Sequence, residues 1–324
     1  MPFVSVIVPC YCAKAYIATT LNALNCQVFR DFEVLLVDDC SPDNTYEFLL
    51  EIIKNYDFPA RVIKNARNTG PAGARNLGVS LSQSSYIAFC DSDDTYTPDF
   101  LAKMVASATA SDADMVFCNH RKITPDGDEI AQTEFPNEIM CASKTKQQIL
   151  TLNADSLCTL LIRRSIITNT PIPDLRNGED MAVIPLMILH SERFAFVDEC
   201  LYNYICRPGS LSLTASDRVT DSLIQAFQYI EENKPDGFST EIEYLGIRNL
   251  LYGALLNHFK HTKDPQKPRE ILANFEKKYP TWHKNPYIAD MPTRKRLFLA
   301  FAKRRFFLGI RLLAFLHKRL TEKG

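Results

Sequence analysis

Several signatures are missing from this chain of 324 residues, and each absence argues against a class of protein. Its ten cysteines include no Cys-x-x-Cys pair, which argues against a zinc knuckle or a thioredoxin-type site. No uncharged apolar run reaches the roughly 18 residues of a membrane span. The N-terminal residues lack the basic region and cleavage site of a secretory signal. Cysteines within apolar runs, such as Cys90 and Cys118, act as small core residues, so we expect a reduced, cytosolic compartment.

The chain has almost no net charge, but its positive and negative residues are unevenly distributed along the sequence. The net charge is −1, whereas residues 294–324 hold ten Lys/Arg and one acid, a net of +9, so the remainder carries −10. A basic tail of this kind suggests contact with an anionic surface. The acidic remainder argues against nucleic acid as a partner, because a nucleic-acid footprint is normally a basic face of the folded domain.

Short apolar segments alternate with helical patterns over roughly the first 120 residues. The apolar segments are residues 4–9, 33–39, 60–65, 85–91 and 114–119, and the helical patterns are 14–25, 44–56, 71–83 and 98–109. This order predicts βαβ units and an α/β fold with a mostly parallel sheet. Continuous hydrophobicity within the strands predicts helices on both faces, and ligands bind beyond the carboxyl ends of such strands.

The pattern changes towards the C-terminus, where helical spacing predominates. Helical patterns occupy 217–234, 239–262, 267–279 and 294–319, with prolines between them. We therefore expect two regions, residues 1–215 and residues 216–324.

Acidic clusters stand where the predicted strands end. Asp38-Asp39 follows the second strand, Asp91-Ser92-Asp93-Asp94 follows the fourth, and Glu179-Asp180 opens an apolar helix. The first and third are also compatible with ordinary turn, capping and helix-dipole roles. In the second, three carboxylates within four residues repel one another unless a cation lies among them. Mg²⁺ or Mn²⁺ fits, because such ions are held by one or two carboxylates together with substrate phosphates.

The loop Asn68-Thr69-Gly70-Pro71-Ala72-Gly73-Ala74-Arg75-Asn76 follows the third strand and leads into a helix. Its small residues let the backbone approach a ligand, and the helix N-terminus with Arg75 favours an anion or a nucleotide. The loop has neither a Walker pattern nor Gly-x-Gly-x-x-Gly, so ATPase and dinucleotide-binding interpretations lose support.

Taken in order, these motifs resemble the family 2 glycosyltransferases of the GT-A fold over about residues 3–210. The matching set is Val6-Ile7-Val8-Pro9-x-Tyr11, Val37-Asp38-Asp39-x-Ser41, Asn68-x-Gly70, Ala74-Arg75-Asn76-x-Gly78, Asp91-x-Asp93-Asp94 and Gly178-Glu179-Asp180. Tyr202-x-Tyr204-x-x-Arg207-Pro208-Gly209-Ser210 is similar to the closing segment of many bacterial members. Residues 1–215 would then form the nucleotide-sugar-binding and catalytic domain.

The resemblance implies which residues bind the donor nucleotide. Asp38 accepts the imide hydrogen of uracil, Pro9 and Tyr11 line the base and ribose pocket, and Asn68 and Arg75 lie nearby. The chain departs from the family at Cys12, where Asn is usual, and at Cys40, where Gly is frequent.

The resemblance also implies roles at the reacting end of the donor. Asp91 contacts ribose or sugar hydroxyls, Asp93 ligates a divalent metal, and Arg207 and Ser210 close over the diphosphate. Asp180 acts as general base, and its place in a first helical turn favours the ionised form. The expected reaction is an inverting, metal-dependent transfer from a nucleoside-diphosphate sugar, by family habit a UDP-sugar, to a saccharide or lipid-linked saccharide. Lipopolysaccharide or capsule is the expected product class.

The basic C-terminal segment 294–319 predicts an amphipathic helix. Arg296, Lys303, Arg304, Arg311 and Lys318 fall on one stripe, while Leu297, Phe301, Leu308, Leu312, Phe315 and Leu316 point elsewhere. Such a helix suits the surface of an anionic membrane, which would make the protein peripheral on the inner face of the cytoplasmic membrane. A helix docked on the acidic body or on a partner protein is the alternative.

Two other functions use similar residues. A sugar nucleotidyltransferase normally carries a glycine-rich basic loop after its first strand, whereas this chain has Pro9-Cys10-Tyr11-Cys12. A non-catalytic nucleotide-sugar-binding or membrane scaffold module would be expected to lack Asp91, Asp93 or Asp180, and all three are present.

Overall fold

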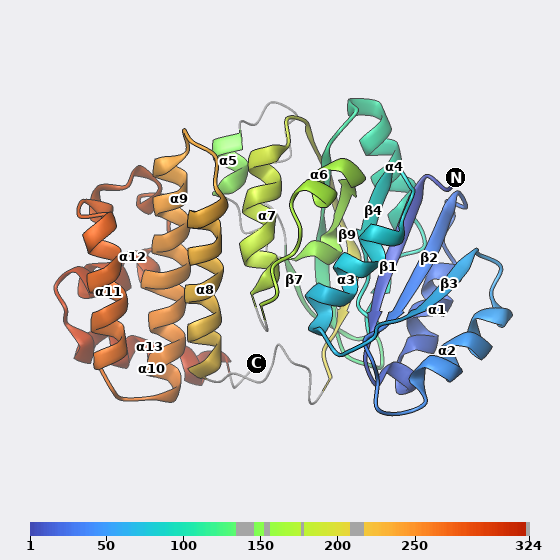
Figure 1. Ribbon diagram of the computed structural model, residues 1–324. Coiled ribbons are helices and arrows are strands. Elements are labelled where there is room, and N and C mark those ends of the chain that lie inside the picture. The colour runs from blue at the N-terminus through green and yellow to red at the C-terminus, as the bar shows by residue number, and fades with distance from the viewer. Residues whose placement is uncertain (134–145, 152–155, 176–177, 208–216, 322–324) are drawn as a thin grey trace. The chain divides into compact units, whose positions relative to one another are not determined.

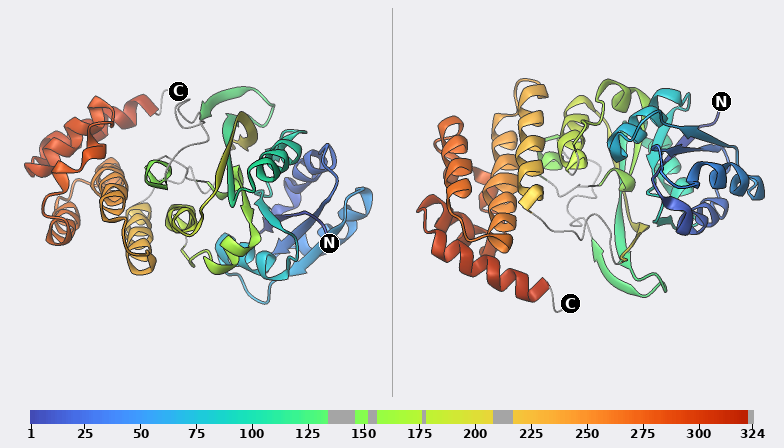
Figure 2. Two further views of the ribbon diagram at one scale, coloured as in Figure 1. Left: turned by 90° about the horizontal axis from the view of Figure 1, so that it is seen from above. Right: turned by 60° about the horizontal axis from the view of Figure 1, so that its bottom comes forward.

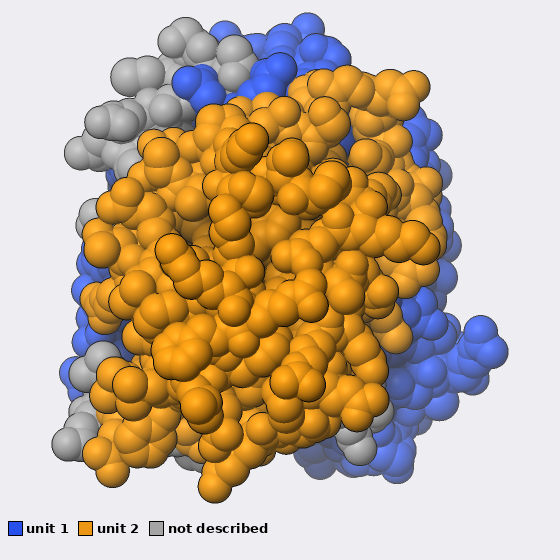
Figure 3. Space-filling view, turned by 90° about the vertical axis from the view of Figure 1, so that its left-hand side faces the viewer, with its two compact units in different colours: residues 1–210 blue, residues 211–324 orange. Residues whose placement is uncertain are grey.

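The computed structural model describes residues 1–133, 146–151, 156–175, 178–207 and 217–321 (Figure 1). The chain divides into two compact units, Met1–Ser210 and Leu211–Gly324, which Figure 3 colours separately. Among the described residues, no helix is long and apolar enough to cross a membrane.

The first unit is built on one sheet of nine strands within the described chain, which confirms the predicted α/β class. The strands are β1 (Val4–Cys10), β2 (Phe32–Asp38), β3 (Ala60–Lys64), β4 (Tyr86–Phe89), β5 (Thr95–Tyr96), β6 (Met115–Ile123), β7 (Glu129–Thr133), β8 (Leu160–Arg163) and β9 (Phe194–Ile205). Their order is β3-β2-β1-β4-β8-β6-β9-β5, with β7 paired to β6.

The first four strands form the parallel part of the sheet. β1 pairs in parallel with both β2 and β4, and β2 pairs in parallel with β3. The chain therefore runs outward from β1 to β3 and then returns to the other side of β1. This reversal between β1 and β4 is a topological switch point, where the loops at the strand ends diverge and leave a crevice for a ligand.

Beyond β4 the sheet is mixed, so the predicted parallel order extends only part of the way. β8 pairs antiparallel with both β4 and β6, and β5 pairs antiparallel with β9. β6 and β9 are parallel neighbours.

Helices cover both faces of this sheet, as the continuous hydrophobicity predicts. Those of the first unit are α1 (Ile17–Asn25), α2 (Thr45–Ile52), α3 (Gly70–Leu81), α4 (Phe100–Ser111), α5 (Lys146–Leu150), α6 (Arg164–Asn169) and α7 (Glu179–His190). Because βαβ crossovers are right-handed, the reversal after β3 places α3 on the face opposite to α1 and α2 (Figure 2). β1 and β2 are buried along almost their whole length.

Helix α3 lies very close to β1. A side-chain carbon added at Gly78 would stand 2.5 Å from Cγ2 of Ile7, closer than atoms can approach. The glycine therefore lets the helix that carries Arg75 lie directly against the central strand.

The second unit is helical, with its own core. Its helices are α8 (Asp217–Asn233), α9 (Ser239–Gly246), α10 (Leu255–His261), α11 (Gln266–Lys278), α12 (Thr293–Lys303) and α13 (Phe307–Thr321), and a π-helical segment, Ile247–Ala254, joins α9 to α10. Trp282 and Phe298 are each only 1% exposed and anchor this core.

The segment 294–319, expected as one helix, consists of two helices, α12 and α13, joined by a turn. Arg305 adopts a left-handed conformation with φ 54°. Its N–H donates to Ala302 O at 2.9 Å, and Phe306 N–H donates to Phe301 O at 2.9 Å. These two bonds form a Schellman motif, which ends α12. The break could not be predicted from the sequence, because the left-handed position that ends a helix normally holds Gly or Asn, whereas here it holds Arg305.

Candidate active site

The predicted site residues lie along the carboxyl edge of the parallel strands. Pro9 pairs with Val37, and Cys10 pairs with Asp38, so the ends of β1 and β2 are level. Tyr11 follows β1 and is 53% exposed. Asp91 follows β4, on the other side of β1. The switch point therefore lies between the residues expected to bind the base and those expected to bind the diphosphate.

Asp38 has a buried carboxylate oxygen with nothing bonded to it. The residue is fully buried, its Oδ2 accepts from Ser41 N–H at 3.3 Å, and its Oδ1 has no hydrogen-bond partner among the described residues. Ser41 Oγ in turn accepts from Cys12 N–H at 3.0 Å, which ties the loop after β2 to the loop after β1. Buried polar atoms are almost always paired, so a free acceptor at a ligand-binding edge indicates that a donor group belongs there.

The neighbouring Asp39 has a structural role. Its carboxylate accepts from the backbone N–H groups of Thr69 and Gly70, the latter at 2.7 Å, and from the Asn65 side-chain amide at 2.9 Å. It therefore ties β2 to the loop before α3 and satisfies N–H groups at the start of that helix. The second acid of the pair thus holds the loop in place, and the first faces the ligand edge.

A buried arginine gathers three of the acids that the sequence analysis singled out. Arg75 Nη2 lies 2.7 Å from Asp91 Oδ1, and its Nη1 lies 3.1 Å from Glu179 Oε1 and 3.7 Å from Asp180 Oδ1. The Arg75 side chain is 5% exposed. Although burial alone would lower the pKa of Arg75, the carboxylates of Asp91, Asp180 and Glu179 raise it well above its usual value. The guanidinium is therefore always charged and joins α3, the β4 end and α7.

Asp180 combines burial with an unused oxygen. Its Oδ2 accepts from Leu157 N–H at 3.1 Å, whereas its Oδ1 has no hydrogen bond in the described structure beyond the longer ion pair to Arg75. Burial raises the pKa of Asp180 to about 7, with Arg75 opposing the shift and Glu179 adding to it. The helix N-terminus was expected to keep this carboxylate ionised, but loss of solvent outweighs the helix dipole here.

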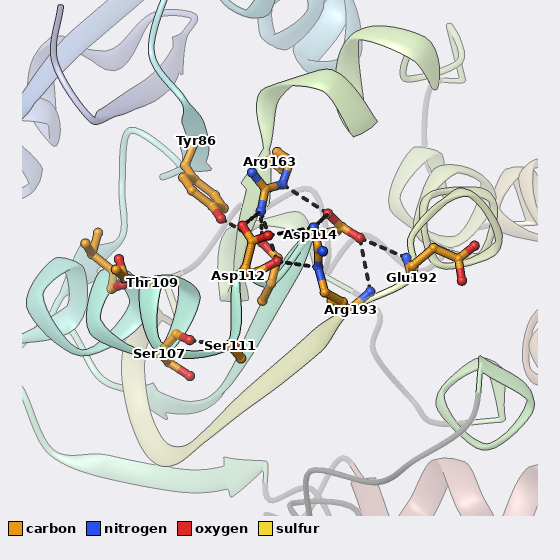
Figure 4. A network of polar contacts seen from close by, with 11 residues as sticks. Tyr86, Ser107, Thr109, Ser111, Asp112, Asp114, Arg163, Glu192 and Arg193 are labelled. Atoms are coloured by element: carbon orange, nitrogen blue, oxygen red, sulfur yellow. Dashed lines mark hydrogen bonds and ion pairs between the residues drawn. The ribbon is translucent and has the colours of Figure 1, made fainter.

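The position of Asp180 is fixed at both ends of α7. Gly178, immediately before the helix, has φ 86°, which a residue with a side chain rarely adopts. At the far end, Asp114 Oδ2 accepts from the backbone N–H groups of Glu192 and Arg193 at 2.9 and 3.0 Å (Figure 4). Asp114 also pairs with Arg163 of β8 at 3.0 Å. The polar network therefore fastens α7 to the sheet.

Asp93 lies against Arg207. Both Nε and Nη2 of Arg207 donate to Oδ2 of Asp93, and the guanidinium carbon stacks 3.5 Å from the ring centroid of Tyr16. Burial raises the pKa of Asp93, Arg207 lowers it, and Asp91 adds to the rise, leaving a raised value. Ser210, predicted to act with Arg207, lies outside the described residues.

Asp94 braces the turn that carries Asp91 and Asp93. Its Oδ2 accepts from Tyr202 OH at 2.5 Å, and its Oδ1 accepts from Ile205 N–H at 2.8 Å. Burial, followed by the charges of Asp91 and Asp93, raises the pKa of Asp94 to about 8. The brace ties the end of β4 to β9, only two residues before Arg207.

Asn68, which was also predicted to bind the donor, has no part in the Arg75 and Asp93 contacts described above. It lies exposed on the loop before α3. Tyr16 and Tyr202 are the residues that sequence reasoning missed as members of the site. Tyr16 lies in a helical pattern without any distinguishing neighbour. Tyr202 belongs to the closing motif, but its partner Asp94 is 108 residues away.

The acids after β4 suit a divalent cation. Among the residues that the structure describes, no three His, Cys, Asp or Glu side chains form a ready-made metal site. However, Mg²⁺ and Mn²⁺ in nucleotide-using enzymes take one or two carboxylates and complete their coordination with phosphates and water. Asp93 and Asp91, with side chains 20% and 36% exposed, supply that donor set.

The fold is that of the GT-A-type glycosyltransferases. The first 349 residues of S. aureus TarS, solved in complex with UDP, align with a TM-score of 0.70 and 20% identity over 98% of this chain and 92% of that one. Mannosyltransferase PcManGT from Pyrobaculum calidifontis, solved with GDP-Man and Mn²⁺, aligns with a TM-score of 0.59 and 16% identity over 94% and 86% of the two chains.

Sequence comparison assigns the family. Residues 5–169 match the model of glycosyl transferase family 2, so the chain belongs to that family and is a glycosyltransferase. The putative teichuronic acid biosynthesis glycosyltransferase TuaG of Bacillus subtilis is 28% identical over 212 residues, 65% of this chain and 82% of that protein. Succinoglycan biosynthesis protein ExoO of Rhizobium meliloti is 26% identical over 259 residues, 76% and 74% of the two chains.

Proposed function

We propose that this glycosyltransferase moves a sugar from a nucleoside-diphosphate donor, a UDP-sugar, to a hydroxyl of a saccharide or lipid-linked saccharide, with inversion at the anomeric carbon. The observation that carries the proposal is the buried, unbonded Oδ1 of Asp180, held beside the Arg75 cluster at the carboxyl edge of the sheet. Residues 1–215 form the donor-binding and catalytic domain in this proposal, and residues 216–324 form a separate helical region.

Donor binding starts at Asp38. Its free Oδ1 accepts a hydrogen bond from the imide N–H of uracil, while Pro9 and Tyr11 flank the base and ribose at the end of β1. Asn68 lies on the loop before α3, on the same edge. A carboxylate is compatible with uracil because the imide of this base presents an N–H donor.

The diphosphate and the sugar of the donor would be bound by Asp91, Asp93, Arg207 and Ser210. A divalent cation held by Asp93, with Asp91 beside it, would neutralise charge that develops on the leaving nucleoside diphosphate. Arg207 supplies a second positive charge when it turns from Asp93 towards the phosphates. Arg75 keeps Asp91 and Asp180 at a fixed separation from each other.

Asp180 acts as the base. An acceptor hydroxyl has a pKa far above 7, so a carboxylate that takes its proton during attack accelerates transfer by about 10²- to 10⁴-fold. A pKa of about 7 places Asp180 close to the working pH, where a general base is most effective. A base on one side of the sugar and a leaving group on the other give a single displacement, and hence inversion.

The relatives indicate the product class. TuaG and ExoO are named for teichuronic acid and succinoglycan biosynthesis, respectively. Both names refer to bacterial polysaccharides, which supports a surface glycan, such as capsule or lipopolysaccharide, as the destination of the transferred sugar.

A nucleotide-release screen across UDP-, GDP- and dTDP-sugars with Mn²⁺ tests this proposal. We expect UDP release from a UDP-sugar, lost on chelation of the metal. Asp180→Asn should still bind UDP but lose transfer, whereas the matched control Asp126→Asn, at an exposed turn, should retain both. Normal turnover in Asp180→Asn would reassign the base, and formation of nucleoside triphosphate and sugar 1-phosphate only when pyrophosphate is added would indicate a nucleotidyltransferase.

A further inference from the structure

Helix α13 is apolar on two opposite sides. One side consists of Phe307, Ile310 and Ala314, which are buried in the core of the second unit. The other consists of Leu308, Leu312, Phe315 and Leu316, which are 68%, 59%, 49% and 47% exposed. We call this second set the outer stripe. A helix whose apolar residues face both the core and solvent has a further partner to cover its outer side.

Two more large apolar side chains are exposed shortly before the outer stripe in the sequence. Phe306, in the turn before the helix, is 49% exposed, and Leu297 on α12 is 45% exposed. Together with the outer stripe they make up six of the thirteen large apolar side chains that stand exposed in the described chain. Their concentration within 20 residues distinguishes this surface from apolar residues scattered singly.

Cations flank the outer stripe, and acids are absent beside it. Residues 293–321 contain nine Lys/Arg and no Asp or Glu. Arg311 and Lys318 lie along one side of the stripe by helical spacing, and the Arg319 guanidinium lies 4.5 Å from the ring centroid of Phe315. Cations on the rim of an apolar surface, with their aliphatic stems packed on it, match the composition of a bilayer interface.

A groove between α13 and the end of α10 adds to this positive charge. Its volume is about 640 Å³, and it is lined by Lys260 and Lys263 on one side and by Arg311 and Lys318 on the other. Phe259, Leu312 and Phe315 form apolar parts of its wall. Burial lowers the pKa of nearby His317, and the positive charges of Lys260, Arg294 and Lys295 lower it further.

We propose that the outer stripe, with the cations of α12, α13 and the α10 groove, lies on an anionic lipid bilayer. The apolar side chains enter the boundary between headgroups and acyl chains, and the cations bind lipid phosphates. A spanning arrangement is not available to the described helices. This inference does not depend on the donor or metal proposed above, since it concerns a surface in a different compact unit.

Charge favours a bilayer over a second copy of the chain. A two-fold contact through the same surface would place Arg311 and Lys318 close to their own counterparts, and like charges repel. An anionic bilayer presents a continuous negative potential to every cation of the surface at once.

Co-sedimentation of the full chain with vesicles tests the proposal. We expect binding to phosphatidylcholine vesicles containing about 30% phosphatidylglycerol, little binding to phosphatidylcholine alone, and release by salt. Leu308→Gln with Leu312→Gln should weaken partitioning at least about tenfold. The matched control, Leu50→Gln with Leu81→Gln, changes two exposed leucines of the first unit and should bind as the unmodified chain does.

A second pair of variants tests the charge. Arg311→Gln with Lys318→Gln should weaken binding to the anionic vesicles by about 30-fold, whereas Lys54→Gln with Lys277→Gln should leave it unchanged. Circular dichroism and thermal melting of every variant confirm that it is folded. Equal binding by stripe and control variants would overturn the proposal. Failure of the unmodified chain to bind anionic vesicles would also overturn it. The same holds if light scattering shows a dimer of the unmodified chain that the double substitution Leu308→Gln with Leu312→Gln dissociates.

Discussion

The Arg75 guanidinium lies 2.7 Å from the Asp91 carboxylate, and this pair is the link between the strand that carries the acidic turn and the helix that opens with Asp180. The same guanidinium also contacts Glu179, which lies 104 positions further along the chain, so one side chain fixes the spacing between the end of β4 and α7. Its removal therefore affects both stability and chemistry.

Arg75→Met should lower the free energy of unfolding by about 3–5 kcal/mol, because it leaves buried carboxylates without their cation. Transfer should fall by at least about 100-fold, since a misplaced base costs rate steeply. Arg75→Lys keeps the positive charge but cannot bind Asp91 and Glu179 through two separate nitrogens of a planar group. Its loss in free energy of unfolding should therefore be smaller than that of Arg75→Met, while its transfer rate should still fall strongly. Urea denaturation and initial rates measure the two effects, and equal losses in the two variants would contradict the bridging role.

The pH dependence of kcat/KM should report Asp180. Burial raises its pKa to about 7, so the protonated, inactive form predominates below that pH. We expect kcat/KM to fall about tenfold for each pH unit below 7, with about nine in ten molecules protonated at pH 6. UDP binding, measured over the same range by calorimetry, should change far less. A flat profile between pH 5 and pH 8 would rule out Asp180 as a base with this pKa.

Asp38→Asn and Asp39→Asn should have different consequences. Asn at position 38 keeps an acceptor for Ser41 but loses the charged acceptor that faces the base, so UDP affinity should fall about 10- to 100-fold with little loss of stability. Asn at position 39 weakens the bonds to Thr69 and Gly70, so it should lower the free energy of unfolding by about 1–3 kcal/mol. Calorimetry and thermal unfolding separate the two, and identical profiles would contradict the division of roles.

Arg207→Gln should change the metal requirement. Arg207 is paired to Asp93 in this structure, so in the proposed function it would compete with a cation for that carboxylate. We expect half-saturating Mn²⁺ to fall by about two- to tenfold while kcat also falls, because the charge that closes over the phosphates is lost. Titration of Mn²⁺ against activity gives both values. A higher Mn²⁺ requirement would mean that Arg207 helps to form the metal site.

Asp114→Asn should destabilise the first unit in a pH-dependent manner. Burial tends to raise the pKa of Asp114, but the N–H groups of Glu192 and Arg193, with the Arg163 charge, outweigh it and lower the pKa. The stabilisation is therefore present above the unfolded-state pKa, near 3.9, and is lost as pH falls through the lower folded value. At pH 7 we expect a loss of about 1.5–3 kcal/mol, measured by urea denaturation. The difference from the unmodified chain should vanish in acid.

Much of the parallel part of the sheet could be predicted because its evidence is local. The predicted strand 33–39 has the uninterrupted apolar run Val34-Leu35-Leu36-Val37, and β2 runs Phe32–Asp38. The same holds for the helix predicted at 98–109, which is α4, Phe100–Ser111. Apolar periodicity and strand-end acids act over a few residues, so they are visible without the fold.

Other features depended on contacts between distant residues. The sequence could not show that Asp39 would bind the loop before α3 while Asp38 kept a free oxygen, because both follow the same strand. It could not show the raised pKa of Asp180, which depends on burial by packing rather than on the helix terminus. The helix at 294–319 was predicted as continuous because no Gly or Pro marks the turn, whereas tertiary packing places Arg305 in a left-handed conformation.

The contact between Gly78 and Ile7 bears on the position of Arg75. Because position 78 has no side chain, the backbone of α3 rests on β1 less than one turn after Arg75. A methyl group at position 78 would collide with Ile7 and push α3 away from β1. This shift would move Arg75 and disturb its ion pairs with Asp91 and Asp180. In the proposed function, the place of Arg75 beside the donor thus depends on the absence of a side chain at position 78.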